Sequence, residues 1–223
     1  MKLRLAATLA GPAITALAVL WLAQPPAALG NPAAALAWAQ DVVPGGPAAE
    51  KYEFVGTGKC RVCHLKIFKS WESGKHGKAL DSLRPGQATA AKARHGLDPD
   101  RDYTRDKGCL ECHVTGLDRK GGYAVPKPGD KKAEKKAKEM AGVGCESCHG
   151  AGSETDKVFQ EIHRTKRKYK VEELYKAGLT RMEVGLCKTC HNPRSPTFDK
   201  EAKFDYEELK KTVHAREELK QRE

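Results

Sequence analysis

The pattern of apolar and polar residues changes sharply near the start of the chain. Residues 5–22 are almost uniformly apolar, and no second run of that length follows. Beyond residue 40, apolar positions recur with helical spacing only over short stretches, which predicts helices at 67–81, 131–140, 171–177 and 206–221. Asp205 stands where it would cap the last of these helices. Strand patterns are weak, and only residues 121–126 favour a short β-hairpin arm.

The pattern therefore predicts a mainly α fold with much irregular structure. Pro and Gly clusters at 126–129, Asn192-Pro193 and Ser195-Pro196 mark loops. We expect one compact domain over residues 56–223, preceded by a linker at 40–55. Because aromatic residues make up only 6% of the chain, side chains alone would build a thin core, and some other apolar group is needed to fill it.

The N-terminal apolar run has the layout of a secretory signal. Met1-Lys2-Leu3-Arg4 is basic, the run follows it, and Ala37-Trp38-Ala39 matches a small-residue cleavage site. We expect a signal peptide at 1–39, although cleavage after Ala37 fits almost as well. The alternative is an uncleaved membrane anchor, but Gly11 and Pro12 interrupt the run. The sequence predicts an exported, periplasmic protein whose mature part does not span a membrane.

All eight cysteines lie in four copies of Cys-x-x-Cys-His, which start at residues 60, 109, 145 and 187. Two thiols three positions apart on a helical turn can both add to the vinyl groups of one porphyrin, and the adjacent histidine then ligates its iron. The pattern predicts four covalently attached haem c groups, which would supply the missing apolar core. The residues expected to bind them are Cys60, Cys63, His64, Cys109, Cys112, His113, Cys145, Cys148, His149, Cys187, Cys190 and His191.

Other sites also use the Cys-x-x-Cys spacing. Zinc ribbons, thioredoxin-like redox pairs and structural disulfides share it. None of them requires a histidine directly after the second cysteine, and here that histidine occurs in all four motifs. The motif starts are 49, 36 and 42 residues apart, which is too irregular for a solenoid repeat but close enough for the haems to crowd together. We expect the chain without haem to be largely unfolded.

Charge adds little to this picture. The formal net charge is +11, and removal of Lys2 and Arg4 with the signal leaves 38 basic against 29 acidic residues. Four haems would bring about eight propionate charges, so the basic composition does not predict nucleic-acid binding. The lysine-rich segment 131–138 and the basic segment 164–168 are either patches that attract acidic redox partners or ordinary solvated faces.

Four histidines lie outside the motifs, namely His76, His95, His163 and His214. Their number equals that needed to give every iron a sixth ligand, although each is individually compatible with an ordinary surface position. If a helix continues from His64 through Trp71, His76 lies about 18 Å further along it. We therefore expect His76 to serve a different haem from the one ligated by His64.

At this point the sequence resembles the tetrahaem cytochrome c-554 family of nitrifying bacteria. The resemblance is strong from about residue 56 to 152 and looser beyond. The stretches that carry it are 58–71, 75–80, 97–99, 102–107, 112–114, 120–123 and 142–150. The lysine-rich segment 131–139 is an insertion relative to that pattern.

The resemblance implies an axial ligand set. It makes His76, His163 and His214 the sixth ligands of three bis-histidine haems, and it leaves the haem of Cys109, Cys112 and His113 five-coordinate. His95 has no counterpart in the family pattern. It is either a surface residue or a ligand that closes the second haem.

The family resemblance implies electron transfer rather than catalysis. Its members accept electrons released by a hydroxylamine oxidoreductase and pass them toward membrane cytochromes that reduce quinone, within the nitrogen cycle. The alternative is that a five-coordinate second haem reduces nitric oxide or a related nitrogen oxide. A third possibility is that the protein is a subunit that carries electrons within a larger multihaem enzyme. The absence of a Cys-x-x-Cys-Lys motif disfavours nitrite reduction, and four haems are too few for a hydroxylamine oxidoreductase. No catalytic side chain is predicted.

Overall fold

The structure is a computed structural model that describes residues 51–196, 198, 204–216 and 222–223. The expected signal peptide and most of the expected linker lie outside these residues. The helices are α3 Thr57–Arg61, α4 Leu65–Ser73, α5 Thr89–Arg94, α6 Lys107–His113, α7 Lys131–Glu139, α8 Cys145–His149, α9 Ser153–Thr165, α10 Val171–Lys176, α11 Val184–Lys188 and α12 Tyr206–Thr212, with a 3-10 turn η1 at Asp81–Leu83.

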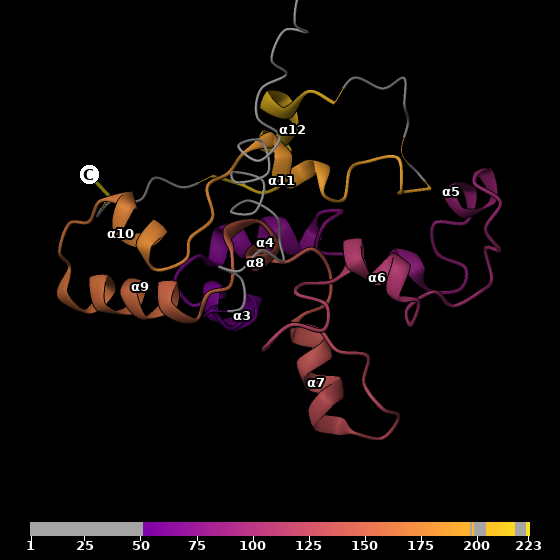
Figure 1. The fold of residues 1–223 in the computed structure, drawn as a ribbon, viewed down its shortest axis with the longest axis horizontal. Helices are drawn as coiled ribbons and strands as arrows, with labels where there is room; N and C mark the ends of the chain where they lie inside the picture. Colours follow the sequence, from indigo (N-terminus) through magenta and orange to yellow (C-terminus); the bar gives the residue numbers. More distant parts are fainter. Residues whose placement is uncertain (1–50, 197, 199–203, 217–221) are drawn as a thin grey trace, which may run out of the picture.

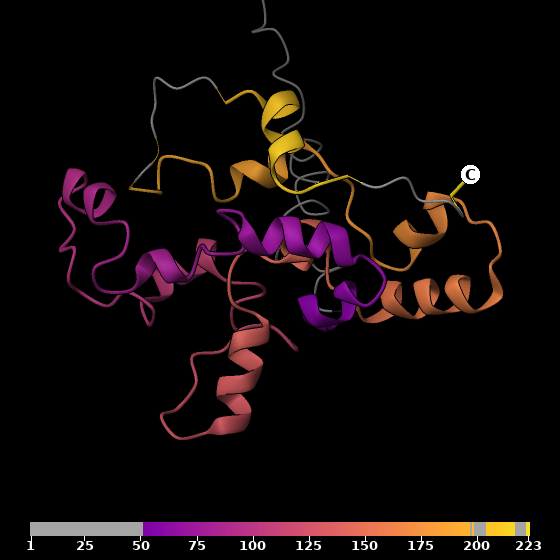
Figure 2. The same cartoon turned by 180° about the vertical axis from the view of Figure 1, so that it is seen from behind.

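The predicted fold class is confirmed. Within the described residues the only β pairings are two isolated bridges, Val114 with Ala141 and Tyr169 with Arg222. In both views of the ribbon, α3, α4 and α8 lie near the middle, α9 and α10 extend to one side and α5 to the other, and α7 projects from the body (Figures 1 and 2). No helix in these ranges is long and apolar enough to cross a bilayer.

Local capping signals explain the helices that the sequence predicted well. Asp130 accepts a hydrogen bond from the Ala133 N–H at 3.0 Å and begins α7, and Asp205 accepts one from the Glu208 N–H at 3.2 Å and begins α12. Such caps satisfy N–H groups that have no partner within the helix. The α7 and α10 predictions are confirmed almost to the residue. The last helix begins where predicted but ends at Thr212, and residues 213–216 are not helical, so it is shorter than the expected 206–221.

Two expectations about local structure are wrong. The helix expected at 67–81 ends at Ser73, because the chain turns back at Gly77, where a Cβ would lie 2.5 Å from the Trp71 carbonyl oxygen. The hairpin expected at 121–126 does not form. Gly121 instead packs against the segment before α3, where a Cβ would lie 2.3 Å from the Phe54 carbonyl oxygen, so this glycine provides a close approach of two backbones rather than a hairpin turn.

The core is small and joins the segments between the first three motifs. Its buried residues are Phe54, Leu80, Leu83, Tyr103, Leu110, Val114, Tyr123, Ala137, Met140 and Ala151. A second cluster of Ile162, Tyr169 and Leu174 joins α9 to α10. Buried Thr115 ties the chain after the second motif to the chain before the third, because its hydroxyl donates to the Gly142 carbonyl at 2.9 Å and accepts from the Gly144 N–H at 2.9 Å.

Candidate haem sites

Each Cys-x-x-Cys-His motif lies on a short helix or on a helix and the turn that follows it. The second and third motifs are helical throughout, in α6 and α8, whereas α3 and α11 hold the first part of the other two motifs. A backbone hydrogen bond from the His64 N–H to the Cys60 carbonyl, 3.0 Å, and the equivalent bond from His191 to Cys187, 2.9 Å, complete the helical turn there. In every motif the two cysteines are therefore about one turn apart, as attachment to one porphyrin requires.

The motifs are neighbours in space in an order that differs from their order in the sequence. The Cys60 thiol interacts with the Cys145 thiol, which is the largest cause of a raised pKa at Cys60, and the Cys112 thiol interacts in the same way with Cys190, whose pKa falls to about 6. Burial, and then the charges of Cys187 and Cys190, raise the pKa of Cys148 to about 11. These contacts link the motifs in the order first, third, fourth, second.

Two of the additional histidines face motif histidines from distant parts of the chain. The ring centroids of His76 and His191 lie 6.0 Å apart, and those of His149 and His214 lie 6.4 Å apart. Two imidazoles on opposite sides of one metal, each with a metal–nitrogen bond of about 2.0 Å, have their ring centroids about 6 Å apart. Both pairs therefore have the separation that a shared iron needs, so the residues fit the group that the motifs imply.

The electrostatics of these histidines also fit ligation, because iron binds the neutral imidazole. Burial and then the neighbouring His214 lower the pKa of His149 to about 4. Burial and then His191 lower the pKa of His76, and burial alone lowers the pKa of His191. The imidazoles are thus neutral at ordinary pH, with a lone pair available.

His113 of the second motif has a different environment. Its Nδ1 lies 2.6 Å from the Ala79 carbonyl oxygen, so that nitrogen carries the proton and Nε2 is left as the ligating atom. His95 lies exposed at the end of α5, and within the described residues no histidine ring is paired with His113.

His64 of the first motif lies beside α9. Its ring is 5.8 Å from the ring of Phe159, edge to face. His163 follows Phe159 by one helical turn, on the same side of α9, and its side chain is exposed. The structure thus brings the helix of His163 to the first motif.

A buried carboxylate that was not predicted from the sequence clamps the first and third motifs together. Glu146 lies between Cys145 and Cys148, is 4% exposed, and accepts hydrogen bonds from the Val55, Gly56 and Gly152 N–H groups at 2.9, 2.7 and 2.7 Å. The clamp fixes the chain just before α3 against α8. Sequence analysis also missed α9, although Val158, Phe159 and Ile162 have helical spacing.

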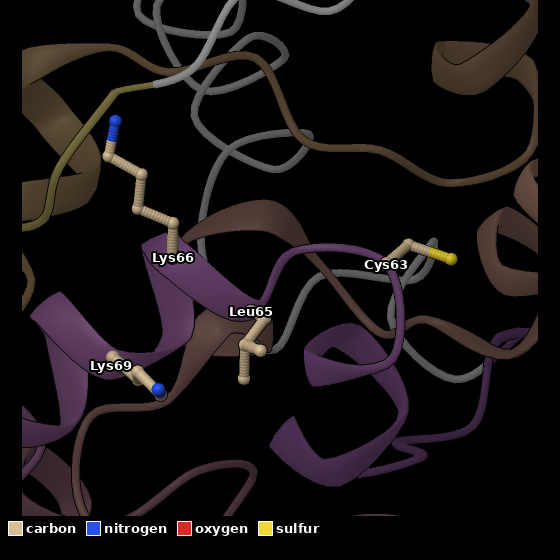
Figure 3. A pocket seen from close by; sticks show the side chains of 4 residues that line it. All are labelled: Cys63, Leu65, Lys66 and Lys69. Carbon is tan, nitrogen blue, oxygen red and sulfur yellow. The ribbon is translucent and has the colours of Figure 1, made fainter.

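A hollow of about 480 Å³ opens at the surface beside the first motif, lined by Cys63, Leu65, Lys66 and Lys69 (Figure 3). Cys63 itself is exposed. A group bonded to this cysteine would therefore have one edge at the molecular surface, next to the two α4 lysines. Within the described residues, no three His, Cys, Asp or Glu side chains converge as in a protein-only metal site.

Comparisons with known proteins agree with these features. The family model described as cytochrome c554 and c-prime matches residues 59–150. The chain is 34% identical over 183 residues to cytochrome c-554 of Nitrosomonas europaea, which covers 73% of this chain and 74% of that protein. The structure matches that of the reduced state of cytochrome c554 from the same organism with a TM-score of 0.60 at 34% identity, covering 74% of this chain and 84% of the other. The resemblance expected from the sequence is confirmed, and the chain belongs to the cytochrome c-554 family.

Proposed function

We propose that the protein is an exported, periplasmic tetrahaem cytochrome that transfers electrons between redox partners. The observation that supports this most directly is the continuous series of four motifs in the order first, third, fourth, second. Haem iron supplies one-electron chemistry when bound. Four such centres held by these neighbouring motifs would provide a path for electrons through the molecule, with the first and second motifs at its ends.

The motif cysteines would hold the four porphyrins through thioether bonds, and His64, His113, His149 and His191 would be the proximal ligands. We assign His76 as the sixth ligand opposite His191, and His214 opposite His149, on the basis of their ring separations. His163 is assigned to the motif of His64, because α9 lies against that motif. The porphyrin fills four coordination positions of a haem iron, and two axial histidines would fill the other two. These three sites therefore suit electron transfer rather than substrate binding.

The protein side chains keep this geometry fixed. Burial holds His76, His149 and His191 neutral and in place, and the Ala79 carbonyl fixes the orientation of His113. Because none of these contacts depends on the oxidation state of a metal, we expect little rearrangement when an electron arrives. Family membership supports a hydroxylamine oxidoreductase-type donor and a membrane cytochrome acceptor, and so a role in the nitrogen cycle.

The test is the haem content and redox behaviour of mature protein from an expression host that attaches haem c. Intact mass and a pyridine haemochrome assay should give four haems per chain and a mature N-terminus near Gln40. Reductive titration should take up four electrons. A colourless, folded preparation, or any stoichiometry other than four, would contradict the proposal.

A second candidate function is the reduction of nitric oxide or a related nitrogen oxide at the second motif. The observation that favours it is the lack of a histidine ring opposite His113 within the described residues, with His95 exposed on α5. Such an iron would have one open position. The electron paramagnetic resonance spectrum of the oxidised protein should then contain a high-spin ferric component, and it should be unchanged by His95→Ala. A spectrum without that component would exclude this function, and a high-spin component that appears only in His95→Ala would identify His95 as the sixth ligand.

A further inference from the structure

The surface around the first motif combines strongly exposed apolar side chains with unpaired positive charge, and no other part of the described chain does so to the same degree. Val62 is 80% exposed and Leu65 is 51% exposed, the two highest values among the large apolar residues that stand out as exposed. Four cations surround them, Lys59, Arg61, Lys66 and Lys69. We define these six residues as the first-motif surface.

The positive charge of this surface is not neutralised locally. Residues 57–71 contain four cations and no carboxylate. None of the four cations is in an ion pair within the described residues, where Arg61 instead lies over the Phe68 ring. Five other lysines in the described residues do form ion pairs, among them Lys157 with Glu154 at 2.8 Å. Unpaired positive charge next to exposed apolar side chains is a surface suited to an acidic partner.

The second motif, at the other end of the path, contrasts with the first. Lys107 there pairs with Asp118 at 2.5 Å, and Glu111 pairs with Arg194. Its intervening Leu110 is fully buried. The two ends of the path therefore differ in both charge and apolar exposure, so they suit different partners.

Attachment of a porphyrin to the first motif would not by itself cover this surface. Cys60 and Cys63 lie three positions apart and so project from one side of the turn, whereas Val62 projects to another side. Lys66 and Lys69 line the same hollow as Cys63, and Figure 3 shows their side chains projecting from α4 while the Cys63 thiol points away from them. The two lysines would therefore lie near the first motif without being covered by the bound group.

Resting on the electron-transfer function above, we propose that the first-motif surface is the docking site for an acidic soluble redox protein, so that this partner exchanges electrons at the first motif and not at the second. An anionic membrane is the less favoured occupant. An amphipathic membrane-binding helix needs a broad apolar face free to enter lipid, and here Trp71 of α4 is buried and donates its indole N–H to the Val143 carbonyl at 2.7 Å.

The experiment uses the full holoprotein and reduced plant-type ferredoxin as the acidic one-electron donor. The variant is Lys66→Glu/Lys69→Glu. The control is Lys132→Glu/Lys135→Glu, which changes the net charge equally but lies on α7, where both lysines are exposed and neither is in an ion pair within the described residues. Stopped-flow absorbance in the haem band gives the second-order rate constant at low and high ionic strength, and the haem content of each variant is checked first.

We expect the Lys66/Lys69 variant to lose at least tenfold in rate at low salt and the control less than twofold, with the difference vanishing at about 1 M salt because charges are then screened over a few ångströms. Equal losses in the two variants would overturn the proposal. So would an unchanged ferredoxin rate with Lys66/Lys69-dependent sedimentation on vesicles of three parts phosphatidylserine to seven of phosphatidylcholine, which would indicate a membrane.

A small reagent separates failure of this proposal from failure of the proposed function. Reduced methyl viologen, a small one-electron donor of low potential, needs no protein docking site, so it should reduce all three proteins. If it does so while the ferredoxin rates show no dependence on Lys66 and Lys69, only the docking site is wrong. If it cannot reduce the wild-type protein reversibly, the electron-transfer function itself is wrong.

Discussion

Replacement of Glu146 by Gln should destabilise the protein, because this carboxylate is buried and accepts hydrogen bonds from three backbone N–H groups. One carboxylate oxygen of Glu146 accepts from both Val55 and Gly152, and the other accepts from Gly56. A glutamine can keep the first two bonds through its carbonyl oxygen. Its NH₂ group then faces the Gly56 N–H, so two donors meet in a buried site.

The magnitude follows from the loss of one buried charge-assisted hydrogen bond. Such a bond contributes about 1.5–3 kcal/mol, and the donor left without a partner is costly in itself. In a chain of this size each kcal/mol shifts the melting temperature by about 2–4 °C, so Glu146→Gln should lower it by about 5–10 °C. Glu146→Ala leaves three N–H groups without a partner and should cost about 3–6 kcal/mol, a large part of a typical total stability.

Equilibrium unfolding in guanidinium, followed by far-ultraviolet circular dichroism of the holoprotein, measures this difference. Glu111→Gln is the matched control, because Glu111 also lies between motif cysteines but is half exposed and paired with Arg194 at the surface. Its loss should be about 1 kcal/mol or less. If the Gln variants at the two positions lost equal stability, the clamp would not act as described.

Three further predictions concern other contacts. Trp71→Phe removes the donor to the Val143 carbonyl and should cost about 1–3 kcal/mol in the same assay; a neutral result would mean that water replaces the indole. Gly122→Ala would place a Cβ 1.9 Å from the Gly116 carbonyl oxygen and should abolish the yield of folded holoprotein, whereas Gly185→Ala, whose Cβ meets nothing within 4 Å, should be tolerated. Burial lowers the pKa of His149 to about 4, and iron ligation, which needs the neutral imidazole, would act in the same direction. An unfolded chain that releases this imidazole takes up a proton below about pH 6.5, so the unfolding midpoint should fall as the pH drops below about 6.5 and stay level above it; a midpoint independent of pH there would show that His149 is kept from protons equally in the folded and unfolded protein.

The sequence was most informative where the structure depends on neighbouring residues. Caps such as Asp130 and Asp205 act within one helical turn, so α7 and the start of α12 were predictable. The helix at 67–81 was overextended, because Gly77 is required by an approach to Trp71 that spacing alone does not reveal. The pairing of His76 with His191 depends on contacts across more than a hundred residues, and no local pattern encodes it.

The same distinction between local and long-range contacts applies to the candidate haem sites. The four motifs identify their own cysteines and proximal histidines, because thioether chemistry fixes the spacing. Glu146 escaped prediction because its role depends on three backbone N–H groups, two of which lie about ninety residues earlier in the chain. The contrast between Val62 and Leu110, at equivalent ends of the path, likewise appears only once burial is known.

The mismatch between spatial and sequence order has a consequence for biosynthesis. The first motif is synthesised 85 residues before the third, which is its neighbour in the finished molecule, and His214, just after α12, is synthesised after every motif has been made. Segments that are synthesised early must therefore stay unpacked until their partner segments have been synthesised. Premature termination shortly before residue 214 would leave all four motifs intact in a molecule unable to close around the third.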